Sequence, residues 1–401
     1  MKKLQRLFSL GPFFLIPALN AISPLIVIPA LTFTYGAGGW AAVAIAQSVG
    51  MAAASMAELG WSVLGPQRVA RLDISSRGEV YMAALASKMS AVAIFSPLSA
   101  VISFNLVTEH RAAAALLAAA ISAGALSSSW YFVGCNRPFS IIWAEGVPRL
   151  ALLSIAGVAI YLGAPLEIYG GALFVAIIFT LVASSRFAMQ PLWPRLSDFR
   201  GGFVEIKAQL PITLGRSISV VYTSLPITLV SLTSPQSVAS FAAVERLMRM
   251  ALSILGGVPS RLQSWIGSAD SSEIVLRSRK SLGYNFSLGM VAAICFFLLA
   301  SVFGGYVFSH TVEIPRLNAF FSSFLLFLIC ISRGYGLSLV AENKGTWIAA
   351  ANILAAVVGI FSILSFSRFL GAPGAIAGEI LAELAGLFLQ AFILHYYRAR
   401  V

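Results

Sequence analysis

The sequence predicts an all-α polytopic membrane protein with twelve transmembrane helices in two parallel-repeat six-helix bundles. Three observations lead to this prediction: a very apolar composition, a regular series of apolar runs, and short motifs that recur half a chain length apart. Hydrophobic residues make up 59% of the 401 residues and charged residues only 10%, and the mean hydropathy is +0.88. No soluble domain buries that much apolar surface, whereas a bilayer accommodates it.

Apolar runs of about 20 residues, the length at which a helix crosses the hydrocarbon core, follow one another with short connections. The first run, which follows a basic start, continues unbroken through PLIVIPALTF, so we expect a membrane span there and not a cleaved signal peptide. The predicted spans are residues 11–34, 38–66, 80–104, 112–134, 140–162, 169–187, 208–232, 237–261, 282–307, 317–341, 346–366 and 372–396.

The distribution of cations between the spans predicts the orientation in the membrane. With the N-terminus inside, eighteen of the 27 Lys and Arg residues fall on inside segments, and only Arg111, Arg316 and Arg368 fall outside. This positive-inside bias places both termini in the cytoplasm, as in a multi-pass protein of a bacterial inner membrane. The net charge of +12 does not indicate binding to nucleic acid, because the cations lie within and between the membrane spans and do not cluster on a soluble face.

Two pairs of motifs indicate an internal duplication. LGAPLEIYGG (162–171) matches LGAPGAIAGE (370–379), and WAAV (40–43) matches FAAV (241–244). Each pair falls at the same place in its half, which favours two parallel repeats with a transport site between them. The predicted organisation is an N-terminal bundle over residues 1–188, a cytoplasmic basic loop over 189–207, and a C-terminal bundle over 208–401.

Charges inside the apolar runs are costly in lipid unless they find a partner or face water, so they mark candidate functional positions. The stretch SFAAVERLMRM (240–250) places three of them in the middle of one run. The predicted substrate-binding residues of a central cavity are Arg149, Arg216, Arg246 and Arg249. The predicted supporting or ion-coupling residues are Glu145, Glu245, Glu379 and Glu383. The three His and three Cys residues lack metal-site spacing, so no metal or cofactor is expected.

Two interpretations of these charges remain open from the sequence. In the first, Glu145 pairs with Arg149 and Glu245 with Arg249, because residues four apart share one helix face. Pro148 lies within the first couple and loosens the helix there. In the second interpretation, the charges line a wet cavity and bind substrate.

The second interpretation depends on the arginines that belong to neither of these two couples. Arg216 and Arg246 would either take up the carboxylates of the last span or face a water-filled cavity, where an arginine fork suits diphosphate oxygens. Glu58 and Lys88 lie at similar depth beside one loop, and we interpret them as a structural pair. Prolines interrupt the first span of each half, which is typical of helices along a transport path.

The sequence resembles a known family in several stretches. These are PLIVIPALTFTYGAGGWAAVAIAQS and ELGWSVLGPQRVAR in the first half, and TSLPITLVSLTSPQSVASFAAVERL, SLVAENKG and FLGAPGAIAGEI in the second. They resemble the polysaccharide-type (Wzx-like) flippases of the multidrug, oligosaccharidyl-lipid and polysaccharide exporter superfamily. The resemblance implies alternating access by two six-helix bundles, and an undecaprenyl-diphosphate-linked oligosaccharide, of O-antigen or exopolysaccharide type, as substrate. It also implies a proton or sodium gradient as the drive, contact with membrane lipids, and glycan assembly proteins as possible partners.

Three competing functions follow from the same features. A multidrug antiporter for organic cations needs acidic cavity residues, and the arginines would suit it poorly. A lipid II flippase of the cell wall usually carries two further helices. A membrane glycan polymerase or ligase needs a large outside loop, and the longest ones here, around 108–111 and 309–316, are too short to build a site. No nucleotide-binding loop or catalytic triad is present, so we expect a transporter and not an enzyme.

Overall fold

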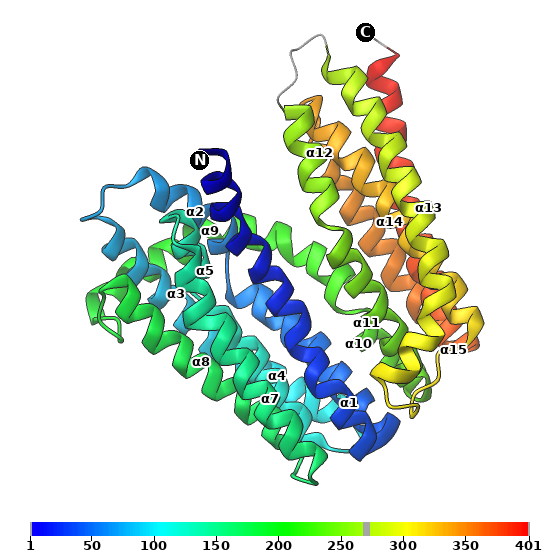
Figure 1. Ribbon diagram of the computed structural model, residues 1–401, viewed down its shortest axis with the longest axis horizontal. Coiled ribbons are helices and arrows are strands. Elements are labelled where there is room, and N and C mark those ends of the chain that lie inside the picture. Colours follow the sequence, from blue (N-terminus) through cyan, green and yellow to red (C-terminus); the bar gives the residue numbers. More distant parts are fainter. Residues whose placement is uncertain (1, 268–272, 400–401) are drawn as a thin grey trace. The chain divides into compact units, whose positions relative to one another are not determined.

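The computed structural model describes the backbone of residues 2–267 and 273–399, and the side chains of that part other than those of residues 2–24, 211–212, 214–219, 221–222, 260 and 264. Every regular element in this part is a helix, which confirms the all-α fold class. The chain forms two compact units, Met1–Val220 and Val221–Val401. In Figure 1 the long helices of each unit lie side by side as a bundle.

Within the described residues, the first unit contains nine α-helices. They are α1 (Lys2–Ala57), α2 (Trp61–Arg71), α3 (Arg77–Leu106), α4 (Arg111–Ala123), α5 (Ser129–Gly134), α6 (Pro138–Ile141), α7 (Val147–Tyr161), α8 (Glu167–Ala188) and α9 (Leu196–Ser224), the last of which ends beyond the unit's boundary. Helix α9 begins inside the predicted loop. Gly202 lets this helix approach α3 closely, since a Cβ there would lie 2.9 Å from the backbone nitrogen of Ser87. The domain boundary at 189–207 remains a prediction.

The second unit contains six α-helices within the described part of the chain. They are α10 (Pro226–Thr233), α11 (Val238–Leu255), α12 (Gly257–Gly267), α13 (Ile274–Val307), α14 (Arg316–Ala341) and α15 (Thr346–Arg398). Helices α13, α14 and α15 pack along one another (Figure 1).

The helices account for the twelve predicted spans. Eight helical segments are long and apolar enough to cross a membrane, as judged by length and composition over the described residues. The first two predicted spans meet at Gly36 (φ 61°, ψ −157°) within α1, and the second of them continues into α2; the last two meet at Gly371 (φ 62°, ψ −134°) within α15. The seventh and eighth predicted spans are the pairs α9–α10 and α11–α12, which are interrupted at Leu225 and at Gly256.

The turns at the repeated motif support the duplication. Gly163 (φ 93°) and Gly371 (φ 62°) occupy the same place in LGAP, and both adopt a backbone conformation that favours glycine. In the first unit, the hydroxyl of Tyr35 donates a hydrogen bond of 2.8 Å to the backbone oxygen of Ala164, which joins the turn at Gly36 to the turn at Gly163. In the second unit, the hydroxyl oxygens of Thr233 and Ser367 lie 2.5 Å apart, so the corresponding turns also meet.

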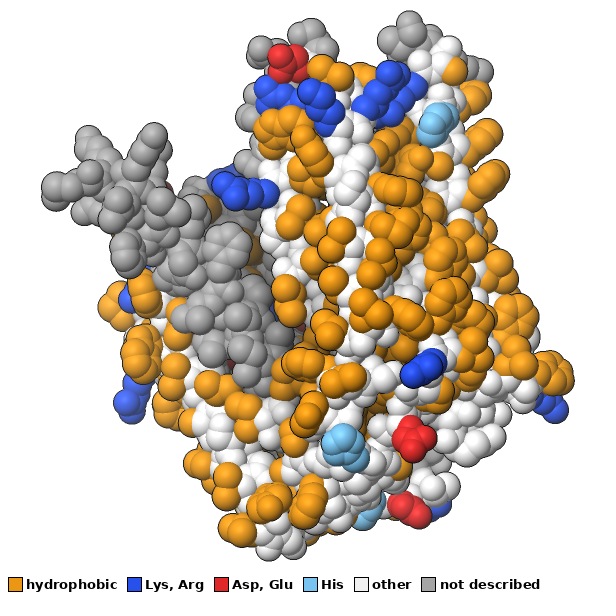
Figure 2. Space-filling view, turned by 45° about the vertical axis from the view of Figure 1, so that its right-hand side comes forward, with side chains coloured by type: hydrophobic (Ala, Val, Ile, Leu, Met, Phe, Trp, Pro, Cys, Tyr) orange, Lys and Arg blue, Asp and Glu red, His pale blue; other side chains and the backbone are white. Residues whose placement is uncertain are grey.

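The outer surface of the second bundle is apolar along much of its length. Helix α13 leaves only a small part of its most apolar stretch buried. Large exposed side chains on it include Val291, Ile294, Leu298, Val302 and Phe303. Figure 2 shows hydrophobic side chains over the middle of this face, with Lys and Arg side chains near the end at which the C-terminus lies. This pattern fits a surface that faces lipid, and the protein is a multi-pass membrane protein.

Candidate functional site

Two neighbouring spans of the first bundle are broken at the same level. After α4, a 3-10 turn over Gly124–Leu126 ends in Ser127, whose backbone is non-helical (φ −50°, ψ 135°). Before α7, residues Ile142–Gly146 form a π-helical turn that contains Glu145. The π-helical turn has a local cause, because Pro148 has no N–H to bond the carbonyl of Ala144. Single π-helical turns often occur at functional sites.

Ser127 connects the two breaks. Its hydroxyl donates a hydrogen bond of 2.6 Å to Oε2 of Glu145, and it accepts one of 3.2 Å from the backbone N–H of Ser129. Its backbone oxygen accepts a hydrogen bond of 2.9 Å from Nζ of Lys88 on α3. Lys88 is only 2% exposed, and its ammonium group lies 5.6 Å from the centre of the Trp130 ring.

Lys88 therefore has a wider role than the predicted pair with Glu58. The carboxylates of both Glu58 and Glu145 attract its ammonium group electrostatically, and its hydrogen bond goes to Ser127. The sequence places Glu58 and Lys88 at one depth but gives no indication of Ser127. The nearest signal is the run Ser127–Ser129, which begins three residues after Gly124, a composition that interrupts helices.

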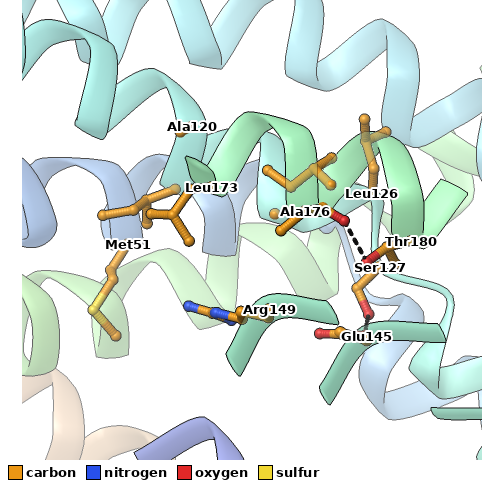
Figure 3. A pocket seen from close by; sticks show the side chains of 12 residues that line it. Met51, Ala120, Leu126, Ser127, Glu145, Arg149, Leu173, Ala176 and Thr180 are labelled. Atoms are coloured by element: carbon orange, nitrogen blue, oxygen red, sulfur yellow. Dashed lines mark hydrogen bonds between the residues drawn. The ribbon is translucent and has the colours of Figure 1, made fainter. Parts of the chain in front are cut away.

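Arg149 projects into a cavity beside this network. The cavity has a volume of about 250 Å³ and lies wholly within the first bundle. Its lining is mostly apolar, and the residues that line it are Met51, Ala120, Ile121, Gly124, Leu126, Ser127, Glu145, Arg149, Leu173, Ala176, Ile177 and Thr180. Figure 3 shows the Arg149 side chain directed into the space below Leu173 and Met51, whereas the Glu145 carboxylate is directed to Ser127.

The ion pair between Glu145 and Arg149, which their spacing predicts, is not formed. Within the described part of the chain, the Arg149 guanidinium makes no hydrogen bond and no ion pair, and its Nε atom is enclosed by protein. The physical reason is the π-helical turn, in which the N–H of Val147 bonds the carbonyl of Ile142, five residues earlier. The extra residue in this turn moves Glu145 off the helix face that carries Arg149.

In the second bundle, the predicted couple on α11 is present. Nε of Arg249 donates a hydrogen bond of 2.7 Å to Oε1 of Glu245, and Nη2 of Arg249 contacts the same oxygen. The two side chains differ in exposure, since Glu245 is 3% exposed and Arg249 is 41% exposed. Arg246, the next residue along α11, is half-buried.

The carboxylates of the last span lie close to this couple. Glu379 and Glu383 are buried on α15, and Glu379 interacts electrostatically with Glu245, Arg249 and Glu383. We call these four residues the acidic cluster of the second bundle. Sequence spacing predicted each couple by itself but not that α11 and α15 bring them together. The side chain of Arg216, the remaining predicted residue, lies outside the described side chains, and its backbone belongs to α9.

Helix order and apolar composition define a class of protein: an all-helical membrane protein whose spans form two repeated bundles. In sequence, neither a protein-family model nor a curated protein matches the chain. Its fold is similar to that of solved membrane proteins, one of which is described as a multidrug resistance MATE family transporter of the MOP superfamily.

Three solved structures illustrate the likeness. One is the lipid II flippase MurJ in an inward closed conformation, with a TM-score of 0.75 and 12% identity over 97% of this chain and 87% of MurJ. Another is an inward-facing multidrug resistance MATE family transporter, with a TM-score of 0.65 and 13% identity over 95% of this chain and 94% of that one. The third is the MATE multidrug transporter DinF-BH in complex with R6G, with a TM-score of 0.60 and 18% identity over 99% and 96% of the two chains.

Proposed function

We propose that the protein is a flippase that moves undecaprenyl-diphosphate-linked oligosaccharide repeat units across a bacterial inner membrane by alternating access. The fold supports a transporter, and one of the proteins that share it is a flippase for lipid II. The lipid-linked substrate has a chemistry that suits such a site, because it combines a diphosphate with an apolar chain. The glycan would be of the O-antigen or exopolysaccharide type.

The single observation that carries this proposal is the position of Arg149. A guanidinium without an ion-pair partner inside a membrane protein is costly, so its retention needs a reason. A mostly apolar cavity that exposes one arginine fork is suited to an oxyanion such as a phosphate or a carboxylate. We assign Arg216, Arg246 and Arg249 to the same function as further cationic contacts for the diphosphate or for acidic sugars.

The acidic cluster is assigned to coupling with an ion gradient. Glu379 interacts electrostatically with Glu245, Glu383 and Arg249, and Arg249 pairs with Glu245. Buried carboxylates in such number favour binding of a proton or a sodium ion, because three negative charges so close together are unfavourable without cations. We therefore propose that a proton or sodium gradient drives the cycle through this cluster.

The same cluster favours a second candidate function, an antiporter for organic cations. The three buried carboxylates of this cluster would attract a cationic drug, and multidrug transporters share the fold. The two functions differ in the charge of the transported molecule. Arg149 is expected to contact the substrate of a flippase and to repel the substrate of a cation antiporter.

A deletion strain distinguishes the two candidates. In a flippase mutant, surface polysaccharide is lost while its repeat unit is still made, so lipid-linked single units accumulate on the cytoplasmic leaflet. Complementation with the intact gene should restore display. A mutant that displays normal glycan and becomes sensitive to organic cations would establish the antiporter instead.

A further inference from the structure

We propose that Ser127 holds the Glu145 carboxylate away from Arg149, and that this keeps the cavity of the first bundle available to an oxyanion. The inference rests on the proposed function only in that the transported molecule would supply the oxyanion. Ser127 acts here as a positioning residue, because it works through Glu145 and not on the ligand itself.

The first step is the competition for Glu145. Residues four apart on a helix attract one another when their charges are opposite, so Arg149 is the nearest cation along the chain with which Glu145 could form an ion pair. In the structure, Oε2 of Glu145 instead accepts the 2.6 Å hydrogen bond from Ser127. Lys88 adds electrostatic attraction from the same side.

The second step is the rigidity of Ser127. Its hydroxyl donates to the carboxylate oxygen of Glu145, and its oxygen at the same time accepts from the N–H of Ser129, so two hydrogen bonds fix this side chain. Its carbonyl is held by Nζ of Lys88, and the neighbouring Ser128 hydroxyl donates to the hydroxyl of Tyr81 at 3.3 Å. The break between α4 and α5 is therefore fixed from both sides, and it presents one donor to Glu145.

The third step is what remains in the cavity. Arg149 is the only basic residue among those that line it, and Glu145 is the only acidic one. The hydroxyl of Thr180 donates to the backbone oxygen of Ala176 at 2.9 Å, so it does not compete as a donor. A volume of about 250 Å³ is roughly that of eight water molecules in the liquid, enough for one carboxylate or phosphate group on a body of several carbons.

The first experiment measures Arg149 directly, without any ligand. Purified protein is treated with phenylglyoxal, which modifies guanidinium groups, and the rate at Arg149 is followed by mass spectrometry of peptides. In Ser127→Ala, Glu145 is released and pairs with Arg149, so the rate should fall about tenfold, the factor for one hydrogen bond to a charged group. In Ser127→Ala with Glu145→Gln, the neutral amide forms no ion pair, and the rate should return to that of the wild type.

Two controls separate positioning from general damage. Arg68, which is exposed and paired with Glu205 at 2.7 Å, should react at the same rate in every variant. Ser127→Thr keeps the hydroxyl and should behave as the wild type, while Ser127→Cys has a weak donor of similar shape and replaces the alanine variant if that variant does not fold. An Arg149 rate in Ser127→Ala equal to that of the wild type overturns the proposal, as does a double variant that stays slow.

The second experiment identifies the oxyanion. Wild-type protein is treated with phenylglyoxal in the presence of farnesyl diphosphate, a prenyl diphosphate, or of glucuronic acid, an acidic sugar. Protection of Arg149 by the first supports the lipid carrier as the source of the oxyanion, and protection by the second supports the glycan. Protection by neither overturns the oxyanion site. Because neither experiment measures export, their failure is distinguishable from failure of the proposed function.

Discussion

Lys88 donates a hydrogen bond of 2.9 Å to the backbone oxygen of Ser127, at the point where the chain breaks between α4 and α5. A fully buried ammonium group thus stabilises an irregular carbonyl and two nearby carboxylates, those of Glu58 and Glu145. Removal of such a cation leaves buried negative charge uncompensated, which is more damaging than loss of the hydrogen bond alone.

We predict that Lys88→Met destabilises the protein by about 3–5 kcal/mol, although the methionine nearly preserves the shape of the side chain. The measurement is the apparent melting temperature of the detergent-purified protein, followed by size-exclusion chromatography after heating. Lys207→Met is the matched control, because Lys207 is exposed on α9, and its effect should stay within about 0.5 kcal/mol. Equal melting temperatures for the two variants would contradict the assigned role of Lys88.

The couple on α11 predicts an asymmetry between its two members. Arg249→Ala leaves the carboxylate of Glu245, which is 3% exposed, without its hydrogen-bonded cation, whereas Glu245→Gln leaves an arginine that is 41% exposed. We expect the arginine variant to lose about 3 kcal/mol or more and the glutamine variant about 1 kcal/mol. Folded yield in membranes and melting temperature test the order. The reverse order would contradict this account of the couple.

Gly371 predicts a different effect, caused by backbone conformation. Its φ of 62° and ψ of −134° disfavour any residue with a Cβ, and such an atom would lie 2.5 Å from the hydroxyl of Ser237. Gly371→Ala should therefore cost about 1–3 kcal/mol. Gly171→Ala is the control, since a Cβ on this α8 residue meets nothing within 4 Å, and alanine there should be neutral or stabilising. If the two variants melt alike, the turn is less constrained than its dihedral angles indicate.

The helical fold and its repeat were predictable from the sequence because lipid imposes simple rules. Each span needs an apolar run of fixed length, and the LGAP motif marks the same turn twice, at Gly163 and Gly371. The couple of Glu245 and Arg249 was predictable for a similar reason, since it depends only on regular helical spacing.

The site of the first bundle was less predictable because it depends on irregular backbone. The spacing of Glu145 and Arg149 predicts an ion pair, and the π-helical turn that prevents it leaves no periodic signal in the sequence. The approach of Ser127 to Glu145 depends on the packing of two spans. The closeness of Glu379 and Glu245 likewise depends on how α15 packs against α11, which composition does not specify.

The distribution of cations gives a prediction about orientation. With eighteen cations expected inside and three outside, both termini should lie in the cytoplasm. A reporter enzyme that is active only in the periplasm, fused after Val401, should give no signal, while the same reporter fused within the turn at residues 309–315 should be active. Signal from the fusion after Val401 would reverse the proposed topology.

Transport by purified protein in proteoliposomes tests the central claim most directly. Lipid-linked oligosaccharide, isolated from the deletion strain, is placed in the vesicles, and its movement between leaflets is followed by an impermeant reagent that oxidises exposed sugars, with a proton or a sodium gradient imposed. The wild type should move the lipid. Arg149→Ala should slow this movement about ten- to a hundredfold, and Arg149→Lys should recover part of the rate, since lysine keeps the charge and loses the fork. Movement no faster than in empty vesicles, or an Arg149→Ala variant at the full wild-type rate, would contradict the account.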